Sequence, residues 1–316
     1  MKVTLDLDEL LHNGDITQAD YEKLSRLAAA TTGSLAFNLL VGFGIVAVAA
    51  AAMALTPTPM TAVVIGLCVL LGGILLRRAN LTQWQLLANI CMLVGALMAG
   101  GGLIVGDDGS LASMLTVTVA FGVVAVLARS RLMAVLATLM LGGCIGARTG
   151  YFHASYGLEI QKPIYTIVLF SLVAAGLHRL SRALPASYLK ITEAASRTAV
   201  FLVNFGFWVG SLWGDHFGRG YAVERTLGHG YISAPLFAIL WAVALLATAI
   251  WAWRNNRRWV LNTVAIFAAI DLYTQWFENL EANAGSVLIA GLVALAAAVG
   301  LSFLNTAMRR RTASPG

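Results

Sequence analysis

The chain has 316 residues, of which 59% are hydrophobic and only 11% are charged, and its mean hydropathy is +0.79. A soluble domain carries about 25% charged residues, so this composition excludes a soluble protein and predicts one that lives in a lipid bilayer. The formal net charge of +6 does not indicate nucleic acid binding, because the basic residues lie in short loops between apolar runs instead of clustering on a polar face.

The apolar runs predict helices and not a membrane β-barrel. Only helices or closed barrels satisfy the backbone hydrogen bonds inside a bilayer. A barrel strand alternates apolar and polar residues over about ten positions, whereas runs such as 39–55 and 287–304 are apolar on all sides. We therefore expect an all-α, polytopic integral membrane protein.

Residues 1–32 are polar and predict a helical hairpin ahead of the membrane domain. Leu7 and Leu10 lie on one side of a short first helix. Thr17 is expected to cap the second helix, with Asp20 three residues later in the position of a capping box. We expect this hairpin to be cytosolic, and either to pack on the first span and the lipid headgroups or to dock a cytosolic protein partner.

From residue 33 onward the sequence contains ten apolar segments of about 17 residues or more, the length at which a helix can cross a bilayer. The segments are 34–55, 60–76, 84–105, 111–128, 131–148, 163–180, 197–214, 231–253, 258–277 and 284–304. They predict a ten-span transmembrane domain over 33–305, followed by a basic cytosolic tail at 306–316.

The distribution of Lys and Arg predicts the orientation of these spans. Cytoplasmic loops of membrane proteins hold an excess of basic residues. With ten spans, 17 of the 21 Lys and Arg residues fall on one side and four on the other, and the excess alternates from loop to loop. We therefore expect both termini in the cytoplasm.

Asp271 is the one carboxylate that lies well inside an apolar segment. A charged side chain at the centre of a bilayer costs about 2.5–3.5 kcal/mol on insertion scales, so Asp271 should face a protein interior or a wet cavity. Thr274, Gln275 and Glu278 lie on the same side of the helix and extend a polar stripe to its outer end. This stripe predicts a solute or ion path in which Asp271 couples to a proton or cation. The alternative is a structural carboxylate, either paired with an outer basic residue such as Arg148 or Arg225 or wetted by the headgroup region.

A second polar group lies in the two large loops expected on the outer side, 150–162 and 215–230. Its members are His153, Asp215, His216 and His229. They could hold zinc or serve a membrane enzyme acting on lipid or glycan, but no H-x-x-x-H or H-E-x-x-H spacing is present, and no hydrolase, phosphate-loop or dinucleotide motif occurs in a suitable context. We therefore expect no metal, no cofactor and no catalytic residue.

Asparagines and glycines inside the segments predict how the helices pack. The asparagines are Asn38, Asn89, Asn204 and Asn262, and the glycines include Gly42, Gly44 and the run 100–102. Amides in membrane helices commonly form hydrogen bonds between helices, and glycines permit close helix contact. The other interpretation of the asparagines is that they line a permeation path.

Three parts of the chain share motifs with one protein group. They are the polar start at 7–24, the glycine-rich third segment with Leu86–Ile90 and Gly100–Ile104, and the end of the chain with Trp276–Leu280, Leu288–Leu292 and Arg309–Arg311. These parts resemble an uncharacterised group of bacterial membrane proteins, known as domain of unknown function 2157 and its relatives. The resemblance implies a multi-span protein of the bacterial inner membrane, and it brings no activity and no catalytic residue.

The main functional hypothesis is a membrane protein that moves or senses a small solute. Ten spans with both ends inside can be divided into five plus five, and an odd-numbered repeat is necessarily inverted in the membrane, as in many secondary transporters. One alternative is a non-transporting scaffold or envelope-stress component that docks a partner through residues 1–32. A weaker alternative is the membrane enzyme that would use the outer His and Asp side chains.

Overall fold

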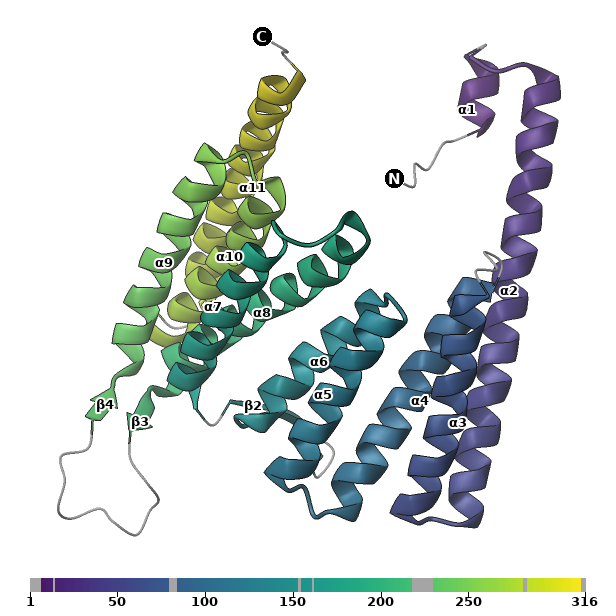
Figure 1. The fold of residues 1–316 in the computed structure, drawn as a ribbon. Helices are drawn as coiled ribbons and strands as arrows, with labels where there is room; N and C mark the ends of the chain where they lie inside the picture. The colour runs from purple at the N-terminus through teal and green to yellow at the C-terminus, as the bar shows by residue number, and fades with distance from the viewer. Residues whose placement is uncertain are drawn as a thin grey trace. The chain divides into compact units, whose positions relative to one another are not determined.

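The computed structural model describes residues 7–13, 15–79, 84–152, 155–160, 162–217, 230–280 and 283–313. This part of the chain forms eleven α-helices and two short antiparallel hairpins (Figure 1). The helices are α1 (Leu7–His12), α2 (Gln18–Leu55), α3 (Pro59–Arg78), α4 (Gln85–Gly106), α5 (Leu111–Leu127), α6 (Arg131–Cys144), α7 (Pro163–Leu180), α8 (Ala186–Trp213), α9 (Ala234–Arg254), α10 (Arg258–Leu280) and α11 (Ala284–Ala313). The hairpins pair β1 (Ala147–Phe152) with β2 (Ser155–Ile160), and β3 (Asp215–Phe217) with β4 (Gly230–Ile232).

Six stretches of helix are long and apolar enough to cross a bilayer. They are Ala36–Leu55, Pro59–Arg78, Gln85–Gly106, Pro163–Leu180, Ala234–Arg254 and Arg258–Glu278. The helices α5 and α6 and the stretch Ala284–Gly300 of α11 are apolar but shorter, and α8 is 28 residues long but more polar. The chain is therefore a multi-span membrane protein, and each of the ten predicted segments falls on one of its helices.

The two large loops contain hairpins that the sequence did not predict. α6 ends at Cys144, four residues before the predicted end of its segment, and Gly146 then has a φ of +90°, a conformation that favours glycine. The chain turns there and enters β1, whose residues pair with those of β2 from Ala147 opposite Ile160 to Phe152 opposite Ser155. Strands this short, mixed with glycines and charged residues, lack the alternation that identifies a strand from sequence.

Two helices extend across the predicted domain boundaries. α2 runs unbroken from Gln18 to Leu55, so the second helix of the predicted hairpin and the first span are one helix. α11 continues to Ala313, through most of the predicted tail at 306–316. The division at residues 32 and 305 stays a prediction about function, since helical continuity does not say where a membrane begins or ends.

The start of α2 is capped as predicted. The Thr17 Oγ1 atom accepts a hydrogen bond from the backbone N–H of Asp20 at 3.2 Å, and it donates one to Asp20 Oδ2 at 2.6 Å. This side-chain hydrogen bond holds the pKa of the Asp20 carboxyl below its usual value. The capping box is therefore fully formed at neutral pH and is lost as the pH falls through that lowered pKa.

The helices form two compact units. The first contains residues 1–141 and 184–195, and the second contains 142–183 and 196–316. In the first unit, α3 and α4 share the most extensive contact, α2 packs against both, and α5 packs against α4 (Figure 1). In the second unit, α10 packs against α9 and α11.

Glycines bring α3 and α4 into backbone contact. A Cβ atom added at Gly66 would meet the backbone nitrogen of Ala99, and one added at Gly95 would meet the backbone of Leu70 and lie 2.7 Å from the carbonyl oxygen of Gly66. The predicted close contact is confirmed at Gly42, Gly100 and Gly102, but it is wrong at Gly44 and Gly101, where such an atom would meet nothing within 4 Å. The closest contact of α3 with α4 thus lies at Gly66 and Gly95, which were not predicted from the sequence.

Arg77, near the end of α3, joins three helices of the first unit. Its Nε donates to the carbonyl oxygen of Ala128 at 2.8 Å, its Nη2 to that of Arg129 at 3.0 Å, and its Nη1 to Asn89 Oδ1 at 2.9 Å. Ala128 and Arg129 follow the last turn of α5, where carbonyl groups lack partners inside the helix. The guanidinium group therefore caps α5 and holds α4, and the predicted interhelical bond of Asn89 is confirmed.

Aromatic side chains form the core of the second unit. Trp241 of α9 is 1% exposed and Phe267 of α10 is 2% exposed, with ring centroids 6.4 Å apart. Phe207 of α8 stacks on Trp241 at 6.5 Å, and Phe201 of α8 meets Phe267 at 5.4 Å. These rings join α8, α9 and α10 and position the site described below.

The glycine contact between α3 and α4 makes a stability prediction. We expect Gly95→Ala to lower the free energy of unfolding by about 1–3 kcal/mol, because the new methyl group meets backbone atoms of α3 that cannot rotate away. The matched control is Gly101→Ala on the same helix, which meets open space and should be neutral or slightly stabilising. Reversible unfolding in mixed micelles measures both, and equal stability of the two variants would show that the contact is not close.

Candidate functional site

Asp271 lies on the inner side of α10 and is only 8% exposed. Phe267, one turn before it, belongs to the aromatic core, as does its neighbour Ile270. The Asp271 Oδ1 atom is buried and accepts no hydrogen bond from any residue in the described part of the chain. Buried polar atoms normally have a partner, and Asp271 Oδ1 is the only carboxylate oxygen among the few buried side-chain atoms of the described residues that lack one.

The alternative interpretation, an ion pair with an outer arginine, involves side chains that the structure does not describe. Arg148 lies in β1, opposite Glu159 in β2, and only its backbone is described. Arg225 lies entirely outside the described residues. The structural role of Asp271 as one half of an ion pair therefore stays a prediction.

The other members of the predicted stripe extend from buried to exposed positions along α10. Thr274 is half-buried, and its Oγ1 accepts a hydrogen bond from the indole N–H of Trp208 in α8 at 3.0 Å. Gln275 is half-buried and Glu278 is exposed. Polar groups thus run from the exposed end of α10 to the buried carboxylate, and Trp208 closes one side of this run.

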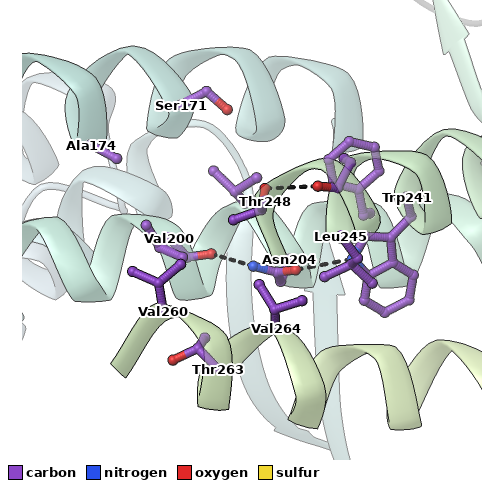
Figure 2. A pocket seen from close by; sticks show the side chains of 13 residues that line it. Ser171, Ala174, Val200, Asn204, Trp241, Leu245, Thr248, Val260, Thr263 and Val264 are labelled. Atoms are coloured by element: carbon purple, nitrogen blue, oxygen red, sulfur yellow. Dashed lines mark hydrogen bonds between the residues drawn. The ribbon is translucent and has the colours of Figure 1, made fainter. Parts of the chain in front are cut away.

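A cavity of about 260 Å³ lies in the second unit, between α7, α8, α9 and α10 (Figure 2). Its polar lining residues are Ser171, Asn204, Thr248 and Thr263, and its other lining residues are Ala174, Val200, Val203, Phe207, Trp241, Ala244, Leu245, Val260 and Val264. No single helix carries more than four of these side chains, so no local pattern in the sequence predicts the cavity.

Asn204 holds the wall of this cavity together. Its Nδ2 donates to the carbonyl oxygen of Val200 at 2.8 Å, and its Oδ1 accepts from the indole N–H of Trp241 at 3.0 Å (Figure 2). The predicted hydrogen bond between helices is confirmed for Asn204, which also lines the cavity. Asn262, by contrast, lies exposed on α10.

The cavity and Asp271 lie at different levels of α10. Asp271 is not among the residues that line the cavity, and it lies about 10 Å further along the helix axis than the lining residue Val264. Phe267 is intermediate between them in the sequence, and its ring packs against Trp241. Phe267, which packs against the cavity-lining Trp241, thus lies between the cavity and the buried carboxylate along α10.

Asp215, the buried member of the predicted outer group, has a structural partner. It is 5% exposed, and its Oδ2 accepts a hydrogen bond from the backbone N–H of Ile164 at 2.9 Å. Ile164 lies in the first turn of α7, whose N-cap residue Lys162 makes no capping bond with its own side chain. A carboxylate is favourable at the positive end of a helix, so Asp215 caps α7 from β3.

The remaining outer histidines give no metal site in the described part of the chain. Among the residues that the structure describes, no three His, Cys, Asp or Glu side chains lie close enough to hold a metal ion. His216 lies in β3, but its side chain is not described, and His153 and His229 lie outside the described residues. The zinc and enzyme alternatives therefore stay predictions.

The bond between Asn204 and Trp241 can be tested by a double-mutant cycle. We expect Asn204→Leu to lower the free energy of unfolding by about 1–3 kcal/mol, because it leaves the buried indole N–H without an acceptor. The double variant with Trp241→Phe should cost less than the two single changes together, because it removes both halves of the bond. Strict additivity in the cycle would contradict this account of the bond.

No family model, no curated protein and no solved structure matches this chain. The resemblance to the uncharacterised bacterial group therefore stays a prediction. Any statement of function must come from the residues of the second unit themselves.

Proposed function

We propose that this protein moves or senses a small solute in the membrane, and that Asp271 is the group at which a proton or a cation is exchanged. The observation that carries the proposal is the buried Oδ1 atom of Asp271, which lacks a hydrogen-bond donor in the described part of the chain. Placing an ionisable group in an apolar span is costly, and such groups in membrane proteins usually serve ion or proton pathways. Asp271 faces the protein and not the lipid, as this role requires.

The arrangement of polar groups along α10 supports the same proposal. Thr274, half-buried Gln275 and exposed Glu278 provide polar atoms between the exposed end of the helix and Asp271. A proton or cation that entered from that end would meet these groups in order. The carboxylate therefore has a polar approach on one side and the aromatic core on the other.

We further propose that the protein crosses a bacterial inner membrane ten times, with both termini in the cytoplasm. Each of the ten predicted segments falls on a helix, and the basic residues alternate between the two sides of that arrangement. Ten spans can be divided into five plus five, and an odd-numbered repeat is necessarily inverted in the membrane, as in many secondary transporters.

The scaffold alternative would act through residues 1–32. Leu10 and Leu11 of α1 are half-buried, and α1 packs against α2, so this end of the chain has an internal partner. Residues 1–6 lie outside the described part of the chain. No specific contact in that described part favours a cytosolic partner, and the scaffold stays a prediction.

The ten-span arrangement can be tested at α5 and α8, two helices that are not among the six long apolar stretches. In a chain whose three cysteines are replaced by alanine, we expect Asp108→Cys and Arg131→Cys to react with a membrane-impermeant thiol reagent from opposite sides, because α5 crosses the membrane between them. The same is expected of Ser187→Cys, in the first turn of α8, and Tyr231→Cys, which follows α8 in β4. Reaction of either pair from the same side would contradict ten spans.

The role of Asp271 can be tested by reconstitution. We expect Asp271→Asn to reduce proton or cation flux in proteoliposomes to the level of empty liposomes, because an amide neither releases a proton nor carries a negative charge that attracts a cation. Asp108→Asn is the matched control, since it makes the same chemical change at an exposed position in the turn after α4, outside the proposed path. Equal flux in the wild-type protein and in Asp271→Asn would remove the proposed exchange role.

A further inference from the structure

We infer that the cavity between α7, α8, α9 and α10 binds a small, uncharged molecule with an apolar body and a hydroxyl or N–H group that donates a hydrogen bond. Binding in this cavity does not depend on the function proposed above. The identification of the bound molecule with the solute that the protein moves or senses does rest on that function.

The lining of the cavity selects against charged ligands. None of the 13 residues that line it is charged (Figure 2). An ion that entered the cavity would lose its hydration without gaining a counter-charge, which is strongly unfavourable in apolar surroundings. Ions and zwitterions are therefore poor ligands, and any proton or cation exchange must take place elsewhere, as at Asp271.

Two polar side chains of the lining, those of Thr248 and Thr263, offer only a hydrogen-bond acceptor. Thr248 Oγ1 donates its hydrogen to the carbonyl oxygen of Ala244 at 2.7 Å, and Thr263 Oγ1 donates to that of Trp259 at 2.9 Å. Each hydroxyl oxygen can therefore only accept from a ligand. Asn204 retains one N–H of its amide after its bonds to Val200 and Trp241. A ligand hydroxyl can donate a hydrogen bond to a threonine oxygen and accept one from the remaining N–H of the Asn204 amide.

The size and shape of the cavity set the scale of the ligand. An apolar protein cavity of about 150 Å³ accommodates benzene, and this cavity measures about 260 Å³. Phe207 and Trp241 supply flat aromatic walls, and the valines supply aliphatic ones. A ring that carries one short polar group is therefore the type of molecule that fits.

The position of the cavity connects it with the buried carboxylate. Trp241 lines the cavity and packs against Phe267, which lies one turn before Asp271 on α10. A ligand against Trp241 would therefore touch the ring that packs against Phe267, one turn before the carboxylate. The cavity and the carboxylate are thus connected through this pair of rings.

The experiment measures protection of a single cysteine in nanodiscs. The chain carries Ala174→Cys in the cavity lining, and Cys68, Cys91 and Cys144 are replaced by alanine. The rate of alkylation by N-ethylmaleimide is measured against increasing concentrations of four probes: benzyl alcohol, its isostere ethylbenzene, benzyl methyl ether, which accepts but cannot donate a hydrogen bond, and benzylammonium. We expect saturable protection by benzyl alcohol, weaker protection by ethylbenzene and the ether, and none by benzylammonium.

Thr248→Val tests the donated hydrogen bond. It keeps the shape of the side chain and removes one acceptor, so we expect the preference for benzyl alcohol over ethylbenzene to fall by about two- to tenfold. Each probe partitions into lipid to the same extent whichever variant is present, so a comparison of this preference between variants is independent of partitioning. Thr116→Val is the matched control, because Thr116 makes the same hydrogen bond to its own helix, to Ala112 at 2.8 Å, at an exposed position of α5.

Two results would overturn the inference. Absence of protection by benzyl alcohol would mean that no such site exists, and equal protection by benzyl alcohol and ethylbenzene, unchanged in Thr248→Val, would mean that the cavity only takes apolar groups such as a lipid acyl chain. Protection with the expected pattern, together with unchanged flux in Asp271→Asn, would retain the binding site and remove the exchange function. Flux that depends on Asp271, without protection of the cavity cysteine by benzyl alcohol, would retain the exchange function and remove the binding site.

Discussion

A polar side chain inside an apolar span must find a partner within the protein, because lipid offers none. Several buried or half-buried polar groups of this chain obey that constraint. Arg77 binds two carbonyl groups and an amide, and Asn204 binds the indole of Trp241. Outside the spans, the buried carboxylate of Asp215 likewise binds the first turn of α7. Each of these bonds joins two segments that are distant in sequence, so the same constraint that satisfies the side chain also fixes the fold. The Oδ1 atom of Asp271 has no such partner among the described residues, and positions that break a general rule of folding are where functional sites are expected.

The two units use different means to pack their helices. In the first, glycines allow α3 and α4 to touch through their backbones, which leaves little space between them. In the second, bulky rings from α8, α9 and α10 hold the helices together. Large rings fill space less completely than close backbone contact does, and the cavity beside Trp241 lies where four helices surround them. The second unit therefore contains both the space for a ligand and the carboxylate whose Oδ1 atom has no partner among the described residues.

Features that depend on local pattern could be predicted from the sequence. The apolar segments, the capping box at Thr17 and the interhelical bonds of Asn89 and Asn204 all follow from residue type and spacing. Features that depend on distant partners could not. From the sequence, Arg77 only helps to predict which side of the membrane a loop lies on, and Asp215 is only one polar residue of an outer loop. Their hydrogen-bond partners lie about fifty positions away in the sequence. The cavity could not be predicted for the same reason, since its lining comes from four helices.

The central claim is that Asp271 is a carboxyl group without an ionic partner that exchanges a proton or cation inside the protein. A hydrophobic carbodiimide tests this most directly, because it reacts with protonated carboxyl groups in apolar surroundings and its products are located by mass spectrometry. The account predicts modification at Asp271 in step with loss of flux, and slower modification when the exchanged cation is present. Loss of flux without modification of Asp271, or modification of Asp271 with unchanged flux, would contradict the account.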